Sequence, residues 1–168
     1  MITAAYCRTM ARYNRWQNDS LYREADGLSD AERRKDRGSF FGSIQQTLGH
    51  ILWGDSMWMS RFDGWTRPDL GIAQSGEYYS DWDALKAERQ TADGKFLDWA
   101  DRITDQELGG DFTWTSTMAD VTRTDPFGLL VMHVFSHQTH HRGQVHAMLT
   151  AAGAKPDATD LPFMPSEI

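Results

Sequence analysis

The chain has 168 residues and a formal net charge of −7, from 17 Lys and Arg against 24 Asp and Glu, which opposes the counterion release that drives general nucleic-acid binding. A single cysteine excludes a disulfide scaffold, and no apolar run reaches the roughly 18 residues of a membrane-spanning helix or has the features of a signal peptide. We therefore expect one domain, residues 1–168, in a reducing cytoplasm, without nucleic-acid or membrane partners.

Four long segments have the apolar periodicity of amphipathic helices. In chain order they cover Ile2–Ala25, Phe40–Phe62, Asp81–Ile103 and Pro126–Ala152. Ser80 and Asp83 resemble a capping box at the start of the third helix. Asp125 is the expected N-cap of the fourth, and Gly153 supplies its C-terminal stop.

The segments between the helices have distinct characters. A charged connector spans 30–38, and the long loop 63–79 is expected to be packed or functional. Alternation over 111–124 favours a short β-hairpin, and the proline-containing tail, 155–168, is expected to lie along the surface. Four amphipathic helices can bury their apolar faces only together, so the predicted fold is an all-α four-helix bundle with a hairpin before the last helix.

Five of the six histidines lie between residues 133 and 146. His137 and His141 are four residues apart, so on a helix their imidazoles can converge on one cation. His141 falls within the apolar stripe of the fourth helix, and His137 flanks it. His133 and His140 point progressively outward, and His140 and His146 are expected at the surface or at a dimer interface.

The remaining histidine, His50, is the expected third ligand, although it lies at the edge of the apolar face of the second helix. Catalytic zinc sites commonly use three protein ligands and leave a fourth position for water or substrate. Gln144 shares the His137 flank and is expected to line the same cavity.

Three polar residues fall where the helical periodicity predicts apolar ones: Gln17, Asp55 and Arg89. A buried carboxylate without a partner is strongly unfavourable. We therefore expect Asp55 to be paired, either with Arg89 or with an imidazole such as His133.

Several motifs together resemble the DinB-like (DinB/YfiT-like) family. They are Tyr13–Trp16, Gly49–Trp53 around His50, Asp55 with Trp58, His137–Gln144 and Asp160–Pro162. The resemblance implies a four-helix bundle with a long second crossover and a divalent metal held by His50, His137 and His141. It also implies a thiol-dependent transferase or isomerase that uses a low-molecular-weight thiol, and a homodimer.

Two functions follow from these features. The first is a metal-dependent enzyme of the transferase or hydrolase type, which acts on a small molecule through a thiolate or hydroxide at zinc, nickel or iron. Gln144 and Asn14 are its candidate polar contacts, and Arg89 is a candidate anion contact. The alternative is a non-catalytic metal-containing bundle that binds a ligand or serves a stress response, with Asp55 or His133 closing the metal's coordination.

Three further expectations concern the surroundings of this site. Because metal ligation needs neutral imidazoles, metal affinity should fall below about pH 6 to 6.5. Trp53, Met57 and Trp58 are interpreted first as core residues, with a pocket wall beside His50 as the alternative. Cys7 is expected to be inert, because no basic cluster at a helix N-terminus lowers its pKa.

Overall fold

The computed structural model describes residues 1–116 and 121–167. Its four long helices are α1 (Ala4–Asp26), α3 (Ile44–Phe62), α4 (Trp82–Arg102) and α6 (Phe127–Ala151). The short helical elements are α2 (Asp30–Arg34), η1 (Ile72–Glu77), α5 (Asp105–Leu108) and η2 (Leu161–Phe163). An antiparallel hairpin, β1 (Asp111–Ser116) and β2 (Val121–Pro126), precedes α6. The prediction of a helical bundle with a hairpin before its last helix is confirmed.

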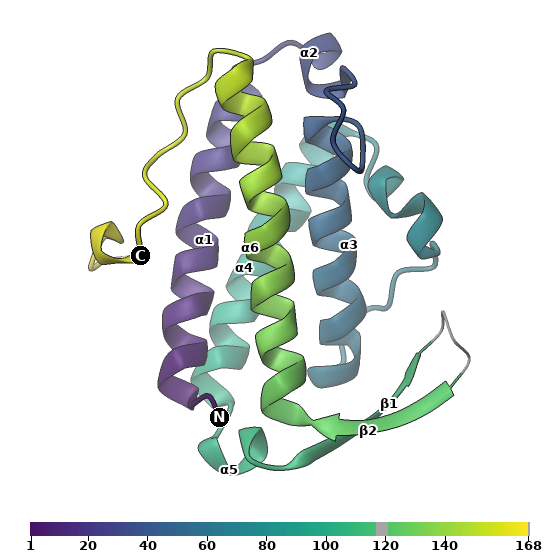
Figure 1. Cartoon of the computed structure of the whole chain (residues 1–168), viewed down its shortest axis with the longest axis vertical. Helices are drawn as coiled ribbons and strands as arrows, with labels where there is room; N and C mark the ends of the chain where they lie inside the picture. The colour runs from purple at the N-terminus through teal and green to yellow at the C-terminus, as the bar shows by residue number, and fades with distance from the viewer. Residues whose placement is uncertain (117–120, 168) are drawn as a thin grey trace.

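The long helices form a bundle in which α1 packs against α4 and α6, while α3 packs against α6 and α4 (Figure 1). Helices α1 and α6 run in one direction, and α3 and α4 run in the other (Figure 1). Since α3 and α4 are parallel, the segment that joins them must return along the length of the bundle. It does so along α3 and contains η1, and this is the long crossover that the family resemblance implies. Within the described residues, no helix has both the length and the apolar character needed to cross a membrane.

The start of α3 differs from the prediction. The helix begins at Ile44 rather than at Phe40, because the Ser43 hydroxyl accepts a hydrogen bond from the Gln46 N–H and caps it. Gly42 precedes this cap with a φ of 77°, a conformation that favours glycine. Phe40 and Phe41 therefore lie in the turn before the helix, and Phe40 is 84% exposed.

Two other predicted caps were wrong. The N-cap of α4 is Asp81, whose carboxylate accepts from the Ala84 N–H, and not Ser80. Asp125 belongs to strand β2, where its carboxylate accepts from the Trp114 indole N–H at 2.8 Å, so it is not the cap of α6. Short helices α2 and α5 were not predicted, although Ser29 and Thr104 cap them with the expected side-chain hydrogen bonds.

The interior consists of two apolar clusters, one toward each end of the bundle. The first includes Leu21, Leu48 and Leu85, and the second includes Met59, Phe96 and Phe135. Between them each long helix contributes buried polar side chains, which we call the polar layer: Asn14, Asn18, Asp55, Arg89, Asp93 and Gln138.

Asp55 is paired with Arg89, as predicted, and not with His133. The Arg89 guanidinium donates to one Asp55 oxygen at 2.6 Å, and the Gln138 amide donates to the other at 2.8 Å. Gln138 in turn accepts from the Asn14 amide. Hydrogen bonds therefore link α1, α6, α3 and α4 through the middle of the bundle.

A second carboxylate completes the polar layer. Asp93 lies 2.9 Å from the Arg89 guanidinium and accepts from the Asn18 amide at 2.9 Å. Burial raises the pKa of both Asp55 and Asp93, whereas the charge of Arg89 lowers it. One guanidinium thus lies between two buried carboxyl groups.

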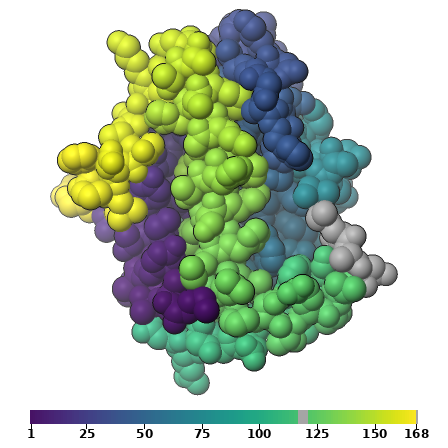
Figure 2. Space-filling model, viewed as in Figure 1, coloured from purple at the N-terminus to yellow at the C-terminus, as the bar shows by residue number. Residues whose placement is uncertain are grey.

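The C-terminal segment lies along α1, which Figure 2 shows as yellow atoms against purple ones. The Tyr13 hydroxyl donates to the Thr159 carbonyl at 2.7 Å, and the Gln17 amide donates to the Ala158 carbonyl at 3.0 Å. The buried Gln17 therefore has its hydrogen-bond partner in the tail.

Candidate metal centre

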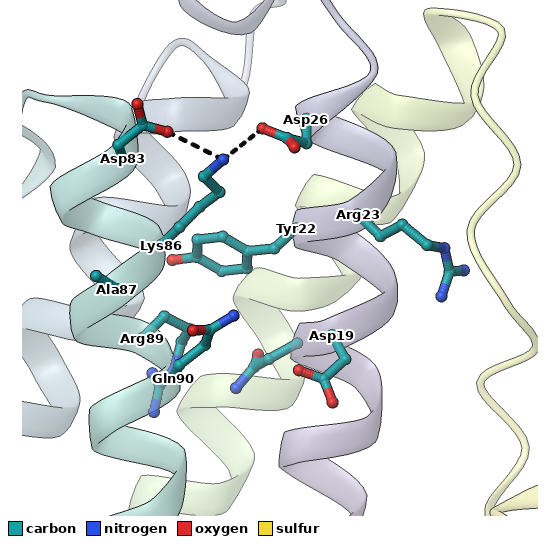
Figure 3. Close-up of a pocket in the computed structure, with 10 residues that line it drawn as sticks. Asp19, Tyr22, Arg23, Asp26, Asp83, Lys86, Ala87, Arg89 and Gln90 are labelled. Atoms are coloured by element: carbon teal, nitrogen blue, oxygen red, sulfur yellow. Dashed lines mark hydrogen bonds and ion pairs between the residues drawn. The ribbon is translucent and has the colours of Figure 1, made fainter.

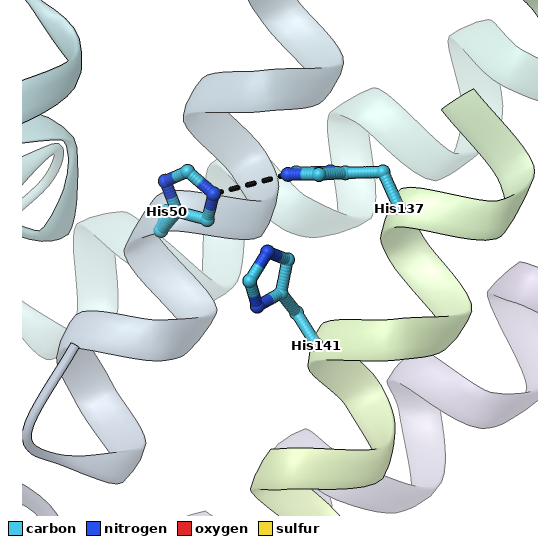
Figure 4. Close-up of side chains that lie close together, drawn as sticks. All are labelled: His50, His137 and His141. Carbon is cyan, nitrogen blue, oxygen red and sulfur yellow. Dashed lines mark hydrogen bonds between the residues drawn. The ribbon is translucent and has the colours of Figure 1, made fainter. Parts of the chain in front are cut away.

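Three imidazoles meet between α3 and α6 (Figure 4). His50 comes from α3, while His137 and His141 come from successive turns of α6, which runs antiparallel beside it. Their candidate ligand nitrogens all lie within 4.8 Å of one another, and Nε2 of His50 is 3.0 Å from Nε2 of His137. The structure thus brings together the three residues that the sequence predicted as ligands.

The crossover segment orients His50. The Ser75 hydroxyl in η1 donates to the Ile72 carbonyl at 2.7 Å, so its oxygen accepts from Nδ1–H of His50 at 2.8 Å. With its proton on Nδ1, the neutral imidazole presents the Nε2 lone pair to the other two histidines. A hydrogen bond to the far nitrogen of a ligand histidine is the usual way in which proteins fix the ring and its tautomer.

Two aromatic side chains stack with the His50 ring. Phe41 stacks on it with ring centroids 3.8 Å apart, and Trp53 lies nearly parallel at 5.8 Å. Phe41 reaches this place because it precedes the helix, in the turn that ends at Ser43. The ring is therefore fixed by stacking as well as by Ser75.

His141 has a comparable arrangement on its own helix. Its Nδ1–H donates to the Gln144 side-chain carbonyl at 2.8 Å, which leaves Nε2 with the lone pair. The Gln144 amide nitrogen lies 3.3 Å from Nε2 of His140. Gln144 thus lines the cavity as expected, and it also positions a candidate ligand.

A glycine makes room for His137. A Cβ atom added to Gly54 on α3 would lie 2.8 Å from Cε1 of His137, which is shorter than a van der Waals contact between two carbon atoms. Only glycine at this position lets the imidazole lie against the backbone of α3. Sequence reasoning missed this residue, although a glycine inside a helical pattern was the available signal.

The three imidazoles are neutral. Burial and the neighbouring imidazoles lower the pKa of His50 and of His137 to about 3, and burial also lowers the pKa of His141. Proton competition for His50 and His137 therefore begins at a lower pH than the predicted limit of about 6 to 6.5. Neutral nitrogen donors at this spacing suit a divalent cation.

The candidate ligands open onto a cavity of about 540 Å³. Its walls include Trp53, Met57 and Trp58 from α3 and Trp114 from the hairpin. The interpretation of the three α3 residues as core is supported, since Trp53 and Met57 are buried and Trp58 packs against the second apolar cluster. The alternative holds as well, because all three also form the wall of the pocket. His133 also lines the cavity, with its ring 5.2 Å from that of Trp58.

The donor set fits a metal with an open coordination position. Zinc–nitrogen bonds of about 2.0 to 2.1 Å in a tetrahedron place neighbouring nitrogens roughly 3.3 Å apart, close to the 3.0 Å between His50 and His137. In the described part of the chain, no Asp, Glu or Cys joins this ligand group. Asp55, a candidate fourth ligand, is occupied by Arg89 and Gln138 in the polar layer.

Two predicted contact residues do not line this cavity. Asn14 is buried in the polar layer, where its amide donates to Gln138. Arg89 lies in the same layer and borders a separate pocket between α1 and α4, beside Tyr22 (Figure 3). At the top of that pocket Lys86 bridges Asp26 and Asp83 (Figure 3).

Cys7 lies far from solvent in the second apolar cluster, with no exposed surface. Burial raises the pKa of its thiol to about 11. The thiol therefore stays protonated at neutral pH, in agreement with the expectation that it is inert.

Comparison with known proteins gives concordant results. Residues 1–167 match the DinB family. The chain is 27% identical over 153 residues to Protein DinB of Bacillus subtilis (strain 168), which covers 88% of this chain and 87% of that protein. The crystal structure of a DinB-like protein from Bacillus cereus ATCC 10987 superposes with a TM-score of 0.60 at 16% identity, over 85% of this chain and 90% of that one. The second similarity concerns the fold alone.

Proposed function

The chain belongs to the DinB family, and from that premise we propose that it is a divalent-metal-dependent enzyme of the thiol-dependent transferase or hydrolase type, acting on a small molecule. The observation that carries this proposal is the group of three neutral imidazoles at the wall of an open cavity. A catalytic metal needs an accessible position, whereas a structural one is closed by a fourth protein ligand.

His50, His137 and His141 would hold the metal, with zinc, nickel and iron as the candidates for imidazole ligands. A dication bound by three neutral ligands keeps its full charge and lowers the pKa of a bound water or thiol by several units, which supplies a nucleophile near neutral pH. The protein's part is to keep these imidazoles deprotonated and aimed at one point. Burial keeps the imidazoles neutral, while Ser75 and Gln144 aim two of them by accepting hydrogen bonds from Nδ1–H of His50 and His141.

The aromatic walls would select the substrate. Trp53, Trp58 and Trp114 exclude water from an apolar molecule and present flat faces to it. Of the three polar contacts expected from the sequence, we retain Gln144 alone, because it lines the cavity. Three further expectations stay predictions: a thiol co-substrate, a homodimer and a cytoplasmic location. Light scattering of the purified protein would test the homodimer.

Elemental analysis of the purified protein tests the metal site. We expect about one transition-metal ion per chain in the unmodified protein and little in the His137→Ala and His141→Ala variants. His146→Ala is the matched control, because His146 is on the same helix outside the ligand group, and it should retain the metal. Equal metal content in all four proteins would contradict the proposed site.

Turnover separates an enzyme from a binding protein. The metal-loaded chain is incubated with a low-molecular-weight thiol and an electrophilic chloronitroarene, and thiol consumption is followed. We expect consumption that the His137→Ala variant lacks. A panel of thiols and hydrolysable esters that gives no metal-dependent turnover would favour the non-catalytic alternative.

A further inference from the structure

The cavity contains a cationic side chain that the metal site does not use. Arg61, in the last turn of α3, lines the same cavity as His50. Their positions in the sequence differ by eleven, so the two residues are within ~20° of each other around the helix and ~16 Å apart along it. Helical side chains lean toward the N-terminus, which brings the Arg61 guanidinium back toward the metal centre. The cavity therefore has a metal centre at one end and a guanidinium toward the other.

Arg61 is held in place by its surroundings. Its guanidinium lies 4.8 Å from the ring centroid of Trp58 and 5.5 Å from that of Trp114. It also donates to the Met57 carbonyl at 3.1 Å and, more weakly, to the Thr115 carbonyl at 3.5 Å. The hairpin and α3 thus fix the side chain from two sides, and little conformational entropy remains to be lost when an anion binds.

The guanidinium has no acidic partner within the described residues. Arg89, Arg102 and Arg123 each lie within ion-pair distance of an Asp, whereas no Asp or Glu of residues 1–116 and 121–167 lies within that distance of Arg61. None of the described residues that line the cavity is acidic, although the chain carries 24 Asp and Glu. A half-buried cation among aromatic rings, without a counter-charge among the residues that the structure describes, is suited to an anion from solution.

We propose that Arg61 binds the carboxylate of a small aromatic acid whose apolar body lies along Trp58 and Trp114, toward the three histidines. The inference rests on the proposed function, because it names the class of small molecule that the same cavity takes. Indole faces give the aromatic body a stacking surface, and the planar guanidinium forms paired hydrogen bonds with a carboxylate. The substrate is thus oriented with its acid group away from the metal centre.

Isothermal titration of the full-length, metal-loaded protein tests this proposal, with naphthalene-2-carboxylate and its neutral amide as probes. We expect the carboxylate to bind about 10- to 100-fold more tightly than the amide, and to lose that advantage in an Arg61→Gln variant. The Arg61→Lys variant keeps the positive charge and should retain part of the preference for the carboxylate over the amide. Arg15→Gln is the matched control, since Arg15 is exposed on α1, and it should bind as the unmodified protein does.

A carboxylate can also bind a metal directly, so the titration is repeated on the His137→Ala chain. Binding that persists there and still depends on Arg61 supports the proposal, even if the chain proves to hold no metal and the proposed function fails. If the carboxylate no longer binds to the His137→Ala chain, and binds to the Arg61→Gln variant as tightly as to the unmodified protein, the proposal is overturned. Equal affinities for carboxylate and amide in the unmodified protein overturn it as well, without any need for a variant to fold.

Discussion

Gly54 shows how strongly a single residue constrains the candidate metal centre. Its missing Cβ is what lets the His137 ring lie against α3, only 3.0 Å from His50. A glycine inside a helix costs roughly 0.5 to 1 kcal/mol relative to alanine, so this position gives up helix stability in exchange for a close approach.

We expect Gly54→Ala to lower metal affinity by about tenfold or more, because the added methyl group must displace the imidazole. Metal affinity is measured by competition with a chromophoric chelator. Gly94→Ala on α4 is the control: a Cβ there meets nothing within 4 Å, so affinity should be unchanged and the free energy of unfolding slightly raised. Wild-type affinity in Gly54→Ala would show that the ring does not need the space.

At the scale of single residues, the sequence predicted the three-histidine group, but not two of the residues that shape and support it. Helical spacing places His137 and His141 on one face, and His50 is the one remaining histidine, so the group was accessible to reasoning from sequence. Gly54 and Ser75 were not, because their roles depend on how closely one helix packs on another and on where a loop folds back.

Among the elements, the crossover between α3 and α4 supplies a support that neither histidine-bearing helix provides. Its η1 turn packs against α3 at Gly49, where an added Cβ would lie 3.0 Å from the carbonyls of Gly76 and Tyr78. This close packing presents the buried Ser75 hydroxyl to Nδ1 of His50. The expectation that the loop 63–79 is packed or functional is therefore confirmed.

Removal of this hydroxyl should loosen His50. We expect Ser75→Ala to lower metal affinity about 10- to 100-fold, because the imidazole loses the partner that fixes its tautomer and orientation. Ser136→Ala, at an exposed position on α6, is the control and should bind metal normally. Metal affinity is again measured by competition with a chromophoric chelator. Equal metal affinity in the Ser75→Ala and Ser136→Ala variants would show that Ser75 does not support the site.

Helix boundaries were the weakest part of the prediction, and one error affected the site. Periodicity assigned Phe40 and Phe41 to the second helix, yet Gly42 and Ser43 end the preceding turn there. Ser43 followed by Gln46 has the spacing of a capping box, so the signal was present in the sequence. No local pattern in the sequence indicates that Phe41 stacks on His50, a candidate ligand.

For the whole molecule, the polar layer divides the apolar interior into two clusters and joins all four long helices. Buried ion pairs of this kind add little net stability, but removal of one partner is costly because the other charge stays buried. The sequence indicated Asp55 and Arg89 by their places on apolar faces. It did not indicate that Asp93 shares the same guanidinium.

We expect Arg89→Met to lower the free energy of unfolding by about 3 to 5 kcal/mol at neutral pH, measured with urea. Arg102→Met is the control, since its ion pair with Asp63 is exposed, and it should cost less than about 1 kcal/mol.

The Arg89→Met deficit should shrink as the pH falls. Without the guanidinium, the raised pKa values of Asp55 and Asp93 rise further, so the folded state binds more protons than the unfolded state and gains stability in acid. A deficit that is independent of pH would mean that the carboxyl groups do not sense Arg89.

The candidate ligands His50 and His137 are 87 positions apart along the chain. An ion shared between them would act as a reversible cross-link that closes a very long loop and restricts the denatured chain. Each tenfold rise in free ion above the dissociation constant would then add about 1.4 kcal/mol to the native state. The melting temperature of this protein would in that way report the concentration of available metal.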